Sequence, residues 1–371
     1  MSGASGLIAI AAGGTGGHMF PAEAVAQELA RRGRRVLLVT DARGRRYAAN
    51  FPAESIFEIP AASPSVGGPA AKALAALALA RGFFATRREF RKRGVVAAIG
   101  FGGYPSFPAM KAAETLGLPY GLHEQNAVLG RTNRVLAGGA RFTAHAFSAL
   151  SRTPRSARLL EVGNPVRDAV VAAAGAPFAP PGQGQEFRLL IFGGSQGASI
   201  FSKAPLAAIA ALPESDRRRL RVVQQAREEE VEKVKAAYAA AGVAAEIAPF
   251  FKDLPRRIVD AHLVVARAGA STVTELSVLG RPSILVPLAI AMDDHQTGNA
   301  RALADAGAAL VIAEKDFDAA RFGDALGALM AEPARLAAMA ASAEGRVKQG
   351  AAAALADLVD DLAGAKEKQA A

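Results

Sequence analysis

Short apolar runs alternate along this chain with alanine-rich helical stretches. The runs have the length of strands, and the stretches between them predict helices. In the first half the runs are LIAIAA (7–12), RVLLVT (35–40), VVAAIG (95–100), GLPYGLH (117–123) and FTAHAF (142–147), with a helix expected from near Phe20. In the second half they are RLLIF (188–192), RVVQQA, AEIAPF, HLVVAR, PSILVP and AALVIA. This alternation predicts an α/β protein with parallel sheets.

The pattern restarts after a Pro/Gly-rich stretch at 175–184. LIAIAAGGTGGH and RLLIFGGSQGAS each place a Gly-Gly turn between a strand and a helix, and Gly13 and Gly193 open the two turns. Each turn is typical of the first βα unit of a doubly wound domain. The sequence therefore predicts two domains, with a boundary near 163–165 or within 175–184. A final helix at about 351–363 can pack on either of them.

Composition and charge exclude several classes of function. The 371 residues contain no cysteine, which excludes disulfides, a thiolate nucleophile and cysteine-ligated metals. The net charge of +10 is uneven: residues 1–165 hold 21 Lys and Arg against 9 Asp and Glu, and residues 166–371 hold 23 against 25. The basic half suggests that one domain faces an anionic surface. With no Trp and 4 Tyr, the chain lacks the aromatic side chains typical of a nucleic-acid binder.

No targeting segment is apparent. The run 7–12 has no basic region before it and continues into a glycine turn, so it predicts a buried strand. The apolar stretch 73–80 ends at Arg81 and is far shorter than the roughly 20 residues that span a bilayer. We expect a cytoplasmic protein that contacts a membrane from the side.

The glycine turns suit phosphate groups. Such turns let backbone N–H groups approach a phosphate at a helix N-terminus. Neither turn has the GxxxxGK[ST] pattern of an ATP-binding loop or the G-x-G-x-x-G spacing of a dinucleotide site. A tight turn without a ligand is the alternative for either one alone. Two such turns opening two domains favour ligand binding at the strand ends.

A third candidate phosphate site is ARAGASTVTEL (266–276). A strand gives way there to small residues and to a helix expected from near Thr272, whose N-terminus suits a diphosphate. Glu275, one turn later, either accepts hydrogen bonds from a ribose diol or is a first-turn acid favoured by the helix dipole. The spacing alone leaves both interpretations open.

Two polar clusters follow apolar strands. LHEQN (122–126) brings together His123, Glu124 and Asn126, and MDDHQ occupies 292–296. Each cluster is either a solvated loop or a substrate-facing group at a strand end.

Seven segments, taken together and in order, are specific. They are GGTGGHMFPA (13–22), GFGGYPSFPA (100–109), LHEQNAVLGRTNR (122–134), VGNPVR (162–167), GGSQGA (193–198), RAGASTVTEL (267–276) and DDHQTGNA (293–300). Through them nearly the whole chain resembles the family of peptidoglycan glycosyltransferases. These enzymes add N-acetylglucosamine to the undecaprenyl-linked muramyl-pentapeptide.

This resemblance implies a GT-B fold, with two Rossmann-like doubly wound domains facing a cleft. Residues 1–164 would take the lipid-linked acceptor at the membrane, residues 165–345 would take UDP-N-acetylglucosamine, and the C-terminal helix at about 346–371 would pack back on the first domain. The reaction would invert the anomeric centre and form a β-1,4 link to the muramic acid 4-hydroxyl. By family precedent neither a metal nor a cofactor is required. The enzyme would lie peripherally on the cytoplasmic face of the inner membrane.

The resemblance also implies which residues bind the donor. Thr15, Gly16 and Gly17 would lie near the donor sugar and diphosphate, and Asn126 and Gln296 would contact the sugar. Nucleotide contacts are expected from Arg167, Ser195 and Phe251, the last near the uracil. The nucleotide would also be lined by the run Ala270, Ser271, Thr272, Val273, Thr274 and Glu275, with Glu275 on the ribose. Some relatives carry Gln-Gln where this chain has His295-Gln296, so no role is carried over to His295.

The general base is left open between two residues. An inverting transfer needs a base within hydrogen-bond reach of the acceptor hydroxyl. His18 closes the first glycine turn and exchanges protons near neutral pH. Glu124 is the alternative. Without a catalytic role, His18 would shape the loop or bind phosphate.

Segment 72–93 is the candidate membrane contact. Its first half is apolar and its second half basic, and Leu79, Phe83 and Phe90 recur at spacings that place them on one helical face. Such a segment can seat apolar residues at the acyl boundary while its cations meet anionic headgroups. A core helix with a solvated basic end is the other interpretation.

Two other enzyme classes fit part of the pattern. A nicotinamide oxidoreductase would use one glycine turn, but the expected glycine spacing is missing. A UDP-sugar epimerase of the same two-domain architecture is the closer alternative. The basic, aromatic-bearing segment 72–93 favours a lipid acceptor over the epimerase.

Overall fold

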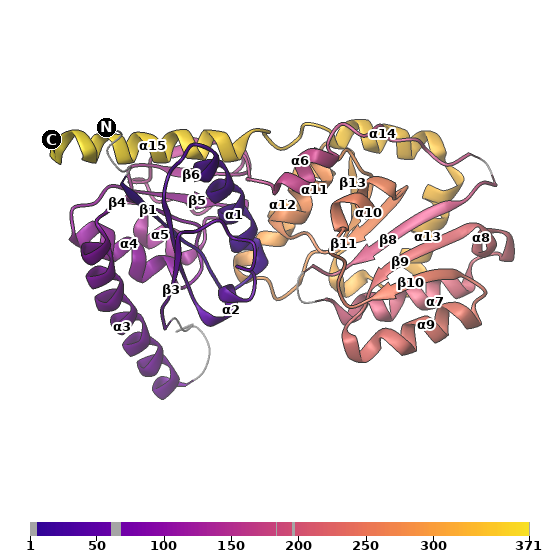
Figure 1. Ribbon diagram of the computed structural model, residues 1–371. Helices are drawn as coiled ribbons and strands as arrows, with labels where there is room; N and C mark the ends of the chain where they lie inside the picture. Colours follow the sequence, from indigo (N-terminus) through magenta and orange to yellow (C-terminus); the bar gives the residue numbers. More distant parts are fainter. Residues whose placement is uncertain (1–5, 61–67, 183, 195–196, 371) are drawn as a thin grey trace. The chain divides into compact units, whose positions relative to one another are not determined.

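The computed structural model describes residues 6–60, 68–182, 184–194 and 197–370. By its contacts the chain divides into two compact units, residues 1–167 with 348–371 and residues 168–347. Each unit is built on one parallel sheet with helices packed against it (Figure 1). The predicted α/β fold of two Rossmann-like doubly wound domains is confirmed.

The first unit holds a seven-stranded sheet in the order β3-β2-β1-β4-β5-β6-β7. Its strands are β1 (Leu7–Ala11), β2 (Val36–Thr40), β3 (Ser55–Glu58), β4 (Val95–Gly100), β5 (Tyr120–Glu124), β6 (Thr143–His145) and β7 (Leu159–Glu161). Its helices are α1 (Gly16–Arg31), α2 (Ala42–Arg45), α3 (Pro69–Arg93), α4 (Ser106–Thr115), α5 (Arg131–Leu136) and α15 (Ala351–Ala370). Because the chain order reverses between β1 and β4, ligands are expected where these strands end.

Two apolar clusters sandwich this sheet. On one face, Ile8, Ile10 and Leu38 pack with side chains of α1 and with Leu355 and Val359 of α15. On the other face, Leu7 and Leu37 pack with residues of α4 and with Phe90 of α3. Strands buried on both faces explain why their sequences are continuous apolar runs.

The second unit repeats this order in a six-stranded sheet, β10-β9-β8-β11-β12-β13. Its strands are β8 (Phe187–Phe192), β9 (Leu220–Gln225), β10 (Ala244–Ala248), β11 (Leu263–Ala266), β12 (Ser283–Leu285) and β13 (Ala309–Val311). Its helices are α6 (Asp168–Ala173), α7 (Ala204–Ala211), α8 (Glu214–Arg219), α9 (Val231–Ala240), α10 (Leu254–Asp260), α11 (Ala270–Val278), α12 (His295–Ala304), α13 (Ala319–Ala331) and α14 (Pro333–Ala343). The reversal falls between β8 and β11, at the second glycine turn and the N-terminus of α11.

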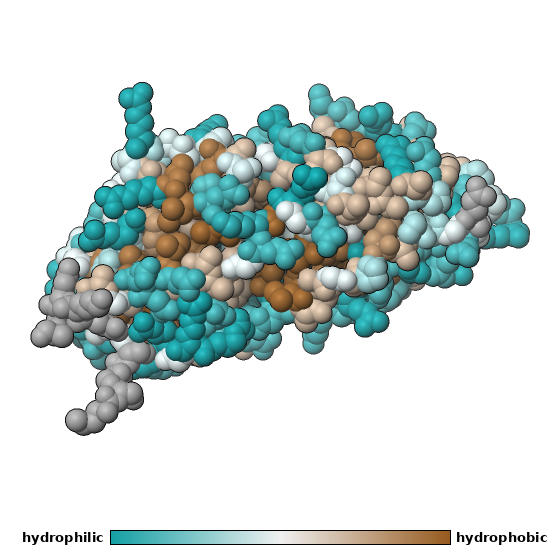
Figure 2. All heavy atoms as spheres, turned by 90° about the horizontal axis from the view of Figure 1, so that it is seen from above, coloured by the Kyte–Doolittle hydropathy of each residue, from teal (hydrophilic) through white to brown (hydrophobic). Residues whose placement is uncertain are grey.

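The last helix packs on the first unit. Arg32 forms ion pairs with Asp357 and Asp360 of α15 at 2.7 and 3.0 Å, and Arg34 pairs with Asp360 at 2.7 Å. The apolar side of α15 is buried, with Leu355 and Val359 both fully covered. Figure 2 looks down on the side that carries α15, where hydrophobic atoms appear in patches interrupted by hydrophilic ones.

The structure corrects several expected boundaries. Strands β3 and β7 were not predicted. Both are short edge strands without a fully buried residue, so neither has the continuous apolar signature of a central strand. Helix α1 begins at Gly16, not near Phe20, and α11 begins at Ala270, not near Thr272. The extended run expected from 117 begins at Tyr120, because Gly117 adopts a φ of 66°.

Candidate functional site

The first glycine turn joins β1 to α1 and is held by a carboxylate. Asp41, which follows β2, accepts hydrogen bonds from the backbone N–H groups of Gly14 at 2.9 Å and Gly44 at 2.8 Å. Thr15 is the N-cap of α1, and its carbonyl accepts from the N–H groups of His18 and Met19. Gly16 and Gly17 form the first turn of the helix. The expected donor-side residues therefore open α1 at the carboxyl end of β1.

His18 lies beside a second glycine-rich loop. A Cβ added to Gly102 would lie 3.3 Å from His18 Cε1, and one added to Gly103 would lie 3.4 Å from His18 Cδ2. Both glycines have positive φ, 83° and 73°. The loop after β4 can therefore approach the imidazole closely only because these positions lack side chains. The motif around residues 100–109 thus packs directly on the candidate base.

The polar cluster at the end of β5 is a buried hydrogen-bonded network. His18 Nδ1 lies 3.0 Å from Gln125 Oε1, and Gln125 Nε2 lies 3.1 Å from His123 Nδ1. His123 Nε2 reaches the carbonyl oxygen of Gly163 at 2.9 Å. Burial lowers the pKa of His123 to about 4, against a smaller opposing effect of its hydrogen bond to Gly163. Gln125 was not among the predicted site residues, although it lies within the LHEQN segment that was singled out.

Glu124 has a different environment from His18. Its side chain is 2% exposed. One carboxylate oxygen accepts from Asn126 N and Nδ2 at 3.0 and 3.1 Å, and the other accepts from Gly130 N and Asn133 Nδ2, both at 2.9 Å. With four donors on two oxygens, this carboxylate ties down the loop after β5 and presents Asn126 beside it.

Arg167 is the last residue of the first unit before the chain enters the second unit. Its guanidinium carbon lies 4.3 Å from the centre of the Phe20 ring, so the cation stacks on α1. This contact attaches Arg167 to the helix that follows the first glycine turn. It was expected to contact the nucleotide, and the structure places it next to the elements that carry Thr15 and His18.

The second glycine turn is held by an amide. Gln225, the last residue of β9, accepts a hydrogen bond from Gly193 N at 3.0 Å and donates one to the Pro249 carbonyl at 3.0 Å. Ser195, expected to contact the nucleotide, lies outside the described residues. Gly193, at the start of this turn, and the N-terminus of α11 follow adjacent strands, β8 and β11.

Helix α11 carries the longest run of expected nucleotide contacts, Ala270 to Glu275. Gly269 is its N-cap, and the loop before it is held by Asn299, which donates to the Ala268 carbonyl at 3.1 Å. Thr274 donates back to the Ala270 carbonyl. Ser271, Thr272 and Val273 lie in the first turn, where N–H groups suit an anion. Glu275 is 6% exposed at this end of the helix.

The loop after β12 borders the same region. Gln296, in the first turn of α12, accepts a hydrogen bond from Leu288 N at 2.9 Å. Arg267 donates to the carbonyl of Val286 and to Glu314, which also accepts from Ala289 N at 2.7 Å. Burial raises the pKa of Glu314, but these two hydrogen bonds outweigh it and the net pKa is lowered. Gln296 is therefore held on a loop braced by an ion pair.

Phe251 is enclosed, and its neighbour is exposed. Phe251 is 7% exposed beneath the guanidinium of Arg257, whose carbon lies 4.3 Å from the ring centre. Phe250 is 57% exposed. Phe250 is therefore the exposed ring of this loop, and Phe251, expected near the uracil, packs beneath Arg257.

The structure corrects the apolar face expected on α3. Phe90 is 1% exposed within the core, and Phe83 packs against the same cluster, so the side that carries Leu79, Phe83 and Phe90 faces the protein. The N-terminal half of α3 extends beyond the sheet (Figure 1). The spacing of Leu79, Phe83 and Phe90 along the sequence showed that they share one face of the helix. It could not show that α4 and the sheet cover this face.

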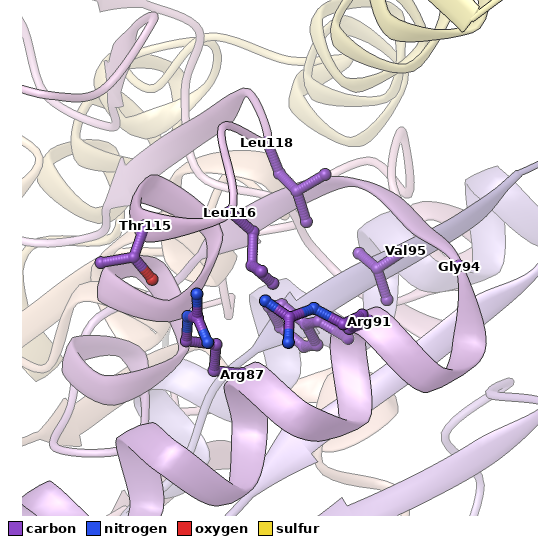
Figure 3. Close-up of a pocket in the computed structure, with 8 residues that line it drawn as sticks. Arg87, Arg91, Gly94, Val95, Thr115, Leu116 and Leu118 are labelled. Carbon is purple, nitrogen blue, oxygen red and sulfur yellow. The ribbon is translucent and has the colours of Figure 1, made fainter.

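The opposite side of α3 is exposed. Leu74, Leu77 and Phe84 are 67%, 55% and 68% exposed. At 3.6 residues per turn they share a stripe with Arg81 and Arg88. Next to this stripe lies a hollow of about 420 Å³, where Arg87 and Arg91 extend from α3 toward the turn that carries Thr115, Leu116 and Leu118 (Figure 3). The surface therefore combines apolar side chains with cations.

The described residues provide a histidine beside the first glycine turn and, in the second unit, backbone N–H groups at the N-terminus of α11 that suit an anion. Within the ranges that the structure describes, no three His, Asp or Glu side chains gather as metal ligands would. The chemistry that these groups support is proton transfer at His18 and stabilisation of an anion at the N-terminus of α11 in the second unit.

Comparison with known proteins gives consistent matches. The model described as "Glycosyltransferase family 28 N-terminal domain" matches residues 8–144, and the "Glycosyltransferase family 28 C-terminal domain" matches residues 188–359. A curated relative from Brucella abortus (strain S19) is 45% identical over 364 residues, covering 98% of this chain and 96% of its own. It is named UDP-N-acetylglucosamine–N-acetylmuramyl-(pentapeptide) pyrophosphoryl-undecaprenol N-acetylglucosamine transferase.

Two crystal structures are also similar. That of Acinetobacter baumannii MurG aligns with a TM-score of 0.77 at 30% identity, covering 96% of this chain and 99% of that one. A UDP-GlcNAc 2-epimerase from Neisseria meningitidis aligns with a TM-score of 0.64 at 11% identity, covering 95% and 98%. The second likeness shows a shared fold alone.

Proposed function

The chain belongs to glycosyltransferase family 28, and we propose on this premise that it performs the transfer for which its curated relatives are named. N-acetylglucosamine passes from UDP-N-acetylglucosamine to the 4-hydroxyl of undecaprenyl-diphospho-muramoyl-pentapeptide in peptidoglycan synthesis. The observation that carries this function is 45% identity over 98% of the chain to relatives with that name. An epimerase shares only the fold, at 11% identity.

The chemical step is a single displacement with inversion. The acceptor oxygen forms a bond to the anomeric carbon while the bond from that carbon to the UDP oxygen breaks. The acceptor hydroxyl gives its proton to the base, and UDP leaves with the electron pair. The protein must therefore supply a proton acceptor on one side of the sugar and stabilise negative charge on the other.

His18 is the proposed base. Its ring is part-exposed at the end of β1, and Nδ1 is engaged with Gln125, so Nε2 is the nitrogen directed to other partners. Glu124 is less suited, because four hydrogen-bond donors already occupy its two oxygens. Glu124 positions Asn126 for the donor sugar instead.

The second unit provides the proposed UDP site. The N-terminus of α11 directs its backbone N–H groups to the leaving diphosphate without a metal. Glu275 would accept hydrogen bonds from the ribose hydroxyls, and Gln296 would contact the sugar. Ser195 keeps its proposed nucleotide contact, on the strength of the matched GGSQGA segment alone. Thr15, Gly16, Gly17 and Arg167 are the proposed contacts from the first unit.

The lipid acceptor requires contact with a membrane, which we place on the exposed side of α3. None of the helices in the described residues is long and apolar enough to cross a bilayer. Leu74, Leu77 and Phe84 would enter the acyl boundary while the arginines meet anionic headgroups. Each cation near the surface contributes about 1 kcal/mol. The enzyme would then act peripherally at the cytoplasmic face of the inner membrane.

The activity test uses purified protein, UDP-N-acetylglucosamine and a short-chain analogue of the lipid acceptor. The expected product is the disaccharide-bearing lipid with release of UDP, formed only when both substrates are present. Conversion of UDP-N-acetylglucosamine alone into its 2-epimer would favour the epimerase and overturn the proposal.

The membrane test uses vesicles that contain anionic lipid. Changing Leu74, Leu77 and Phe84 to Ser should reduce co-sedimentation and slow transfer to a long-chain acceptor, with UDP affinity unchanged. Val171→Ser, at a position 58% exposed on α6 of the second unit, is the matched control. Added salt should weaken binding through screening. Binding that responds to neither salt nor the triple change would place the contact elsewhere.

A further inference from the structure

Three successive hydrogen bonds link His18 to the interior of the first unit. They run from His18 Nδ1 to Gln125 Oε1 at 3.0 Å, from Gln125 Nε2 to His123 Nδ1 at 3.1 Å, and from His123 Nε2 to the Gly163 carbonyl at 2.9 Å. His123 is fully buried, and Gln125 is 1% exposed. Each group in such a chain limits the proton positions of the next.

At the inner end of this series of hydrogen bonds, only one arrangement of the hydrogens is possible. A carbonyl oxygen only accepts, so His123 Nε2 must carry a hydrogen to bond Gly163. Burial keeps His123 neutral, with a pKa of about 4, so its Nδ1 is bare and must accept. The part of Gln125 that faces Nδ1 is therefore its NH₂ group. The same group lies 3.3 Å from the His123 carbonyl, a second partner that only accepts.

The outer end follows from the inner one. With its NH₂ group directed to His123, Gln125 presents its carbonyl oxygen to His18. His18 Nδ1 must then donate, so neutral His18 carries its hydrogen on Nδ1 and a lone pair on Nε2. Nothing in the described part of the chain is seen to hydrogen-bond that Nε2. The close approach of Gly102 and Gly103 to the ring holds its plane.

We propose that Gln125 is a positioning residue that selects the reactive tautomer of His18, with His123 as its buried anchor. This inference rests on the proposed role of His18 as base. A base with the opposite tautomer would present an N–H group to the acceptor hydroxyl and could not take its proton. The series of hydrogen bonds ends at the Gly163 carbonyl, which has no proton to pass on. The series therefore orients His18 and does not conduct a proton away.

The tautomer is measured without substrate, by NMR of protein labelled with ¹⁵N-histidine. The chain has five histidines, His18, His123, His145, His262 and His295, so single substitutions assign the signals. At a pH where the rings are neutral, the expected result is a protonated Nδ1 and bare Nε2 for His18, with the reverse for His123. In Gln125→Met, His18 should relax toward a mixture of both tautomers. A wild-type His18 with its hydrogen on Nε2 would overturn the proposal.

Kinetics test the consequence. Gln125→Met should lower kcat about 10- to 100-fold, which is no more than the lower limit of the 10²- to 10⁴-fold that a general base contributes, and leave KM for UDP-N-acetylglucosamine unchanged. Gln224→Met is the matched control, because Gln224 is a fully buried glutamine in the second unit that bonds the Phe201 carbonyl and Tyr238. That control should lower stability and keep kcat. Equal loss of kcat in both variants would reduce Gln125 to a structural role.

A double variant guards against misfolding. Gln125→Met with His123→Phe removes both buried polar side chains together, so neither leaves the other unsatisfied although the Gly163 carbonyl loses its donor, and Phe preserves ring packing on Phe101. It should recover stability but not kcat or the His18 tautomer. Full recovery of kcat would contradict the inference. If the predicted tautomers are found but His18→Ala keeps its turnover, the base assignment fails while the hydrogen-bond chain stands.

Discussion

Each unit closes the turn after its first strand with a side chain from the end of its second strand, and the two side chains differ in charge. In the first unit Asp41 binds the N–H groups of Gly14 and Gly44. In the second unit Gln225 binds the N–H of Gly193 and the carbonyl of Pro249. The strand order is the same, so position in the fold does not explain the difference.

The difference matches the division of labour proposed for the two turns. A buried carboxylate repels a diphosphate, whereas a neutral amide does not. Arg43 lies 3.4 Å from Asp41 but is 57% exposed, so it offsets that charge only weakly. The first turn therefore suits a neutral sugar and a histidine base, and the second suits the leaving UDP. Two units with the same strand order thus differ in chemistry through one side chain each, Asp41 and Gln225.

The largest effect should come from removing the base in the first unit. His18→Ala should lower kcat by about 10²- to 10⁴-fold at saturating substrates, with UDP affinity unchanged, because only the proton acceptor is lost. Kinetics across pH and calorimetry with UDP measure the two quantities. His295→Ala, at a half-buried histidine on α12 of the second unit, is the control and should keep both. Near-normal turnover of the His18 variant with an unaltered pH profile would exclude it as base.

The next effect concerns the free energy of unfolding in acid, to which each unit contributes one buried histidine with a lowered pKa. Burial lowers the pKa of His123 in the first unit to about 4, and burial together with Arg188 and Arg281 lowers that of His262 in the second to about 4. Unfolded histidine binds its proton near pH 6.5, so the unfolded state holds more protons between pH 6.5 and 4. The free energy of unfolding should therefore fall as pH drops through this window, by about 3 kcal/mol from His123.

Urea unfolding at several pH values, followed by circular dichroism, checks this slope. His123→Gln should have lower stability at pH 7 but a shallower decline between pH 6.5 and 4 than the wild type. His262→Gln should flatten the decline by a similar amount, because the pKa of His262 is also lowered to about 4. An unchanged slope in the His123 variant would mean that His123 is not kept neutral by the fold.

The sequence alone predicted the central strands of both sheets, but it did not predict the edge strands β3 and β7. Strands such as LIAIA and LVVA are buried on both faces, so local composition alone identifies them. The edge strands β3 and β7 are partly exposed and lack that signal. The face of α3 was assigned wrongly because apolar residues occur on both sides of that helix, and only packing shows which side is covered.

The motifs identified the site segments, but not the residues that hold them. Asp41 and Gln225 act on glycines 27 and 32 positions away, and Gln125 acts on a histidine 107 positions away. Such contacts depend on strand order and register, which no local pattern states. Of the three, Gln125 was the easiest to predict from the sequence, because it lies within a polar cluster at a strand end.

Recognition of the UDP ribose should depend on the second unit. Glu275→Ala should weaken UDP binding by roughly 1–3 kcal/mol through loss of a charged hydrogen bond to the ribose. Glu124→Ala removes the comparably buried carboxylate of the first unit and should leave UDP affinity unchanged, since its donors are groups of its own loop. Calorimetry with UDP measures both. Equal effects, or none for Glu275, would reject the ribose contact.

The smallest effect comes from exchanging the charges of the two turns. Gln225→Glu places a carboxylate beside Gly193 and should weaken UDP binding by roughly 1–2 kcal/mol, about tenfold in Kd, through repulsion of the diphosphate. Asp41→Asn removes the charge from the first turn, keeps an acceptor for Gly14, and should leave UDP affinity unchanged.

Gln225→Met separates charge from the lost hydrogen bonds, because it removes both bonds of Gln225 without adding a carboxylate. Calorimetry at low and high salt then tests the cause. The deficit of Gln225→Glu should shrink as ionic strength rises, since screening weakens repulsion between the carboxylate and the diphosphate. The deficit of Gln225→Met should not change with salt. A salt-independent loss of equal size in both variants would show that Gln225 acts only by shaping the turn, and that the charge difference between the units has no part in donor binding.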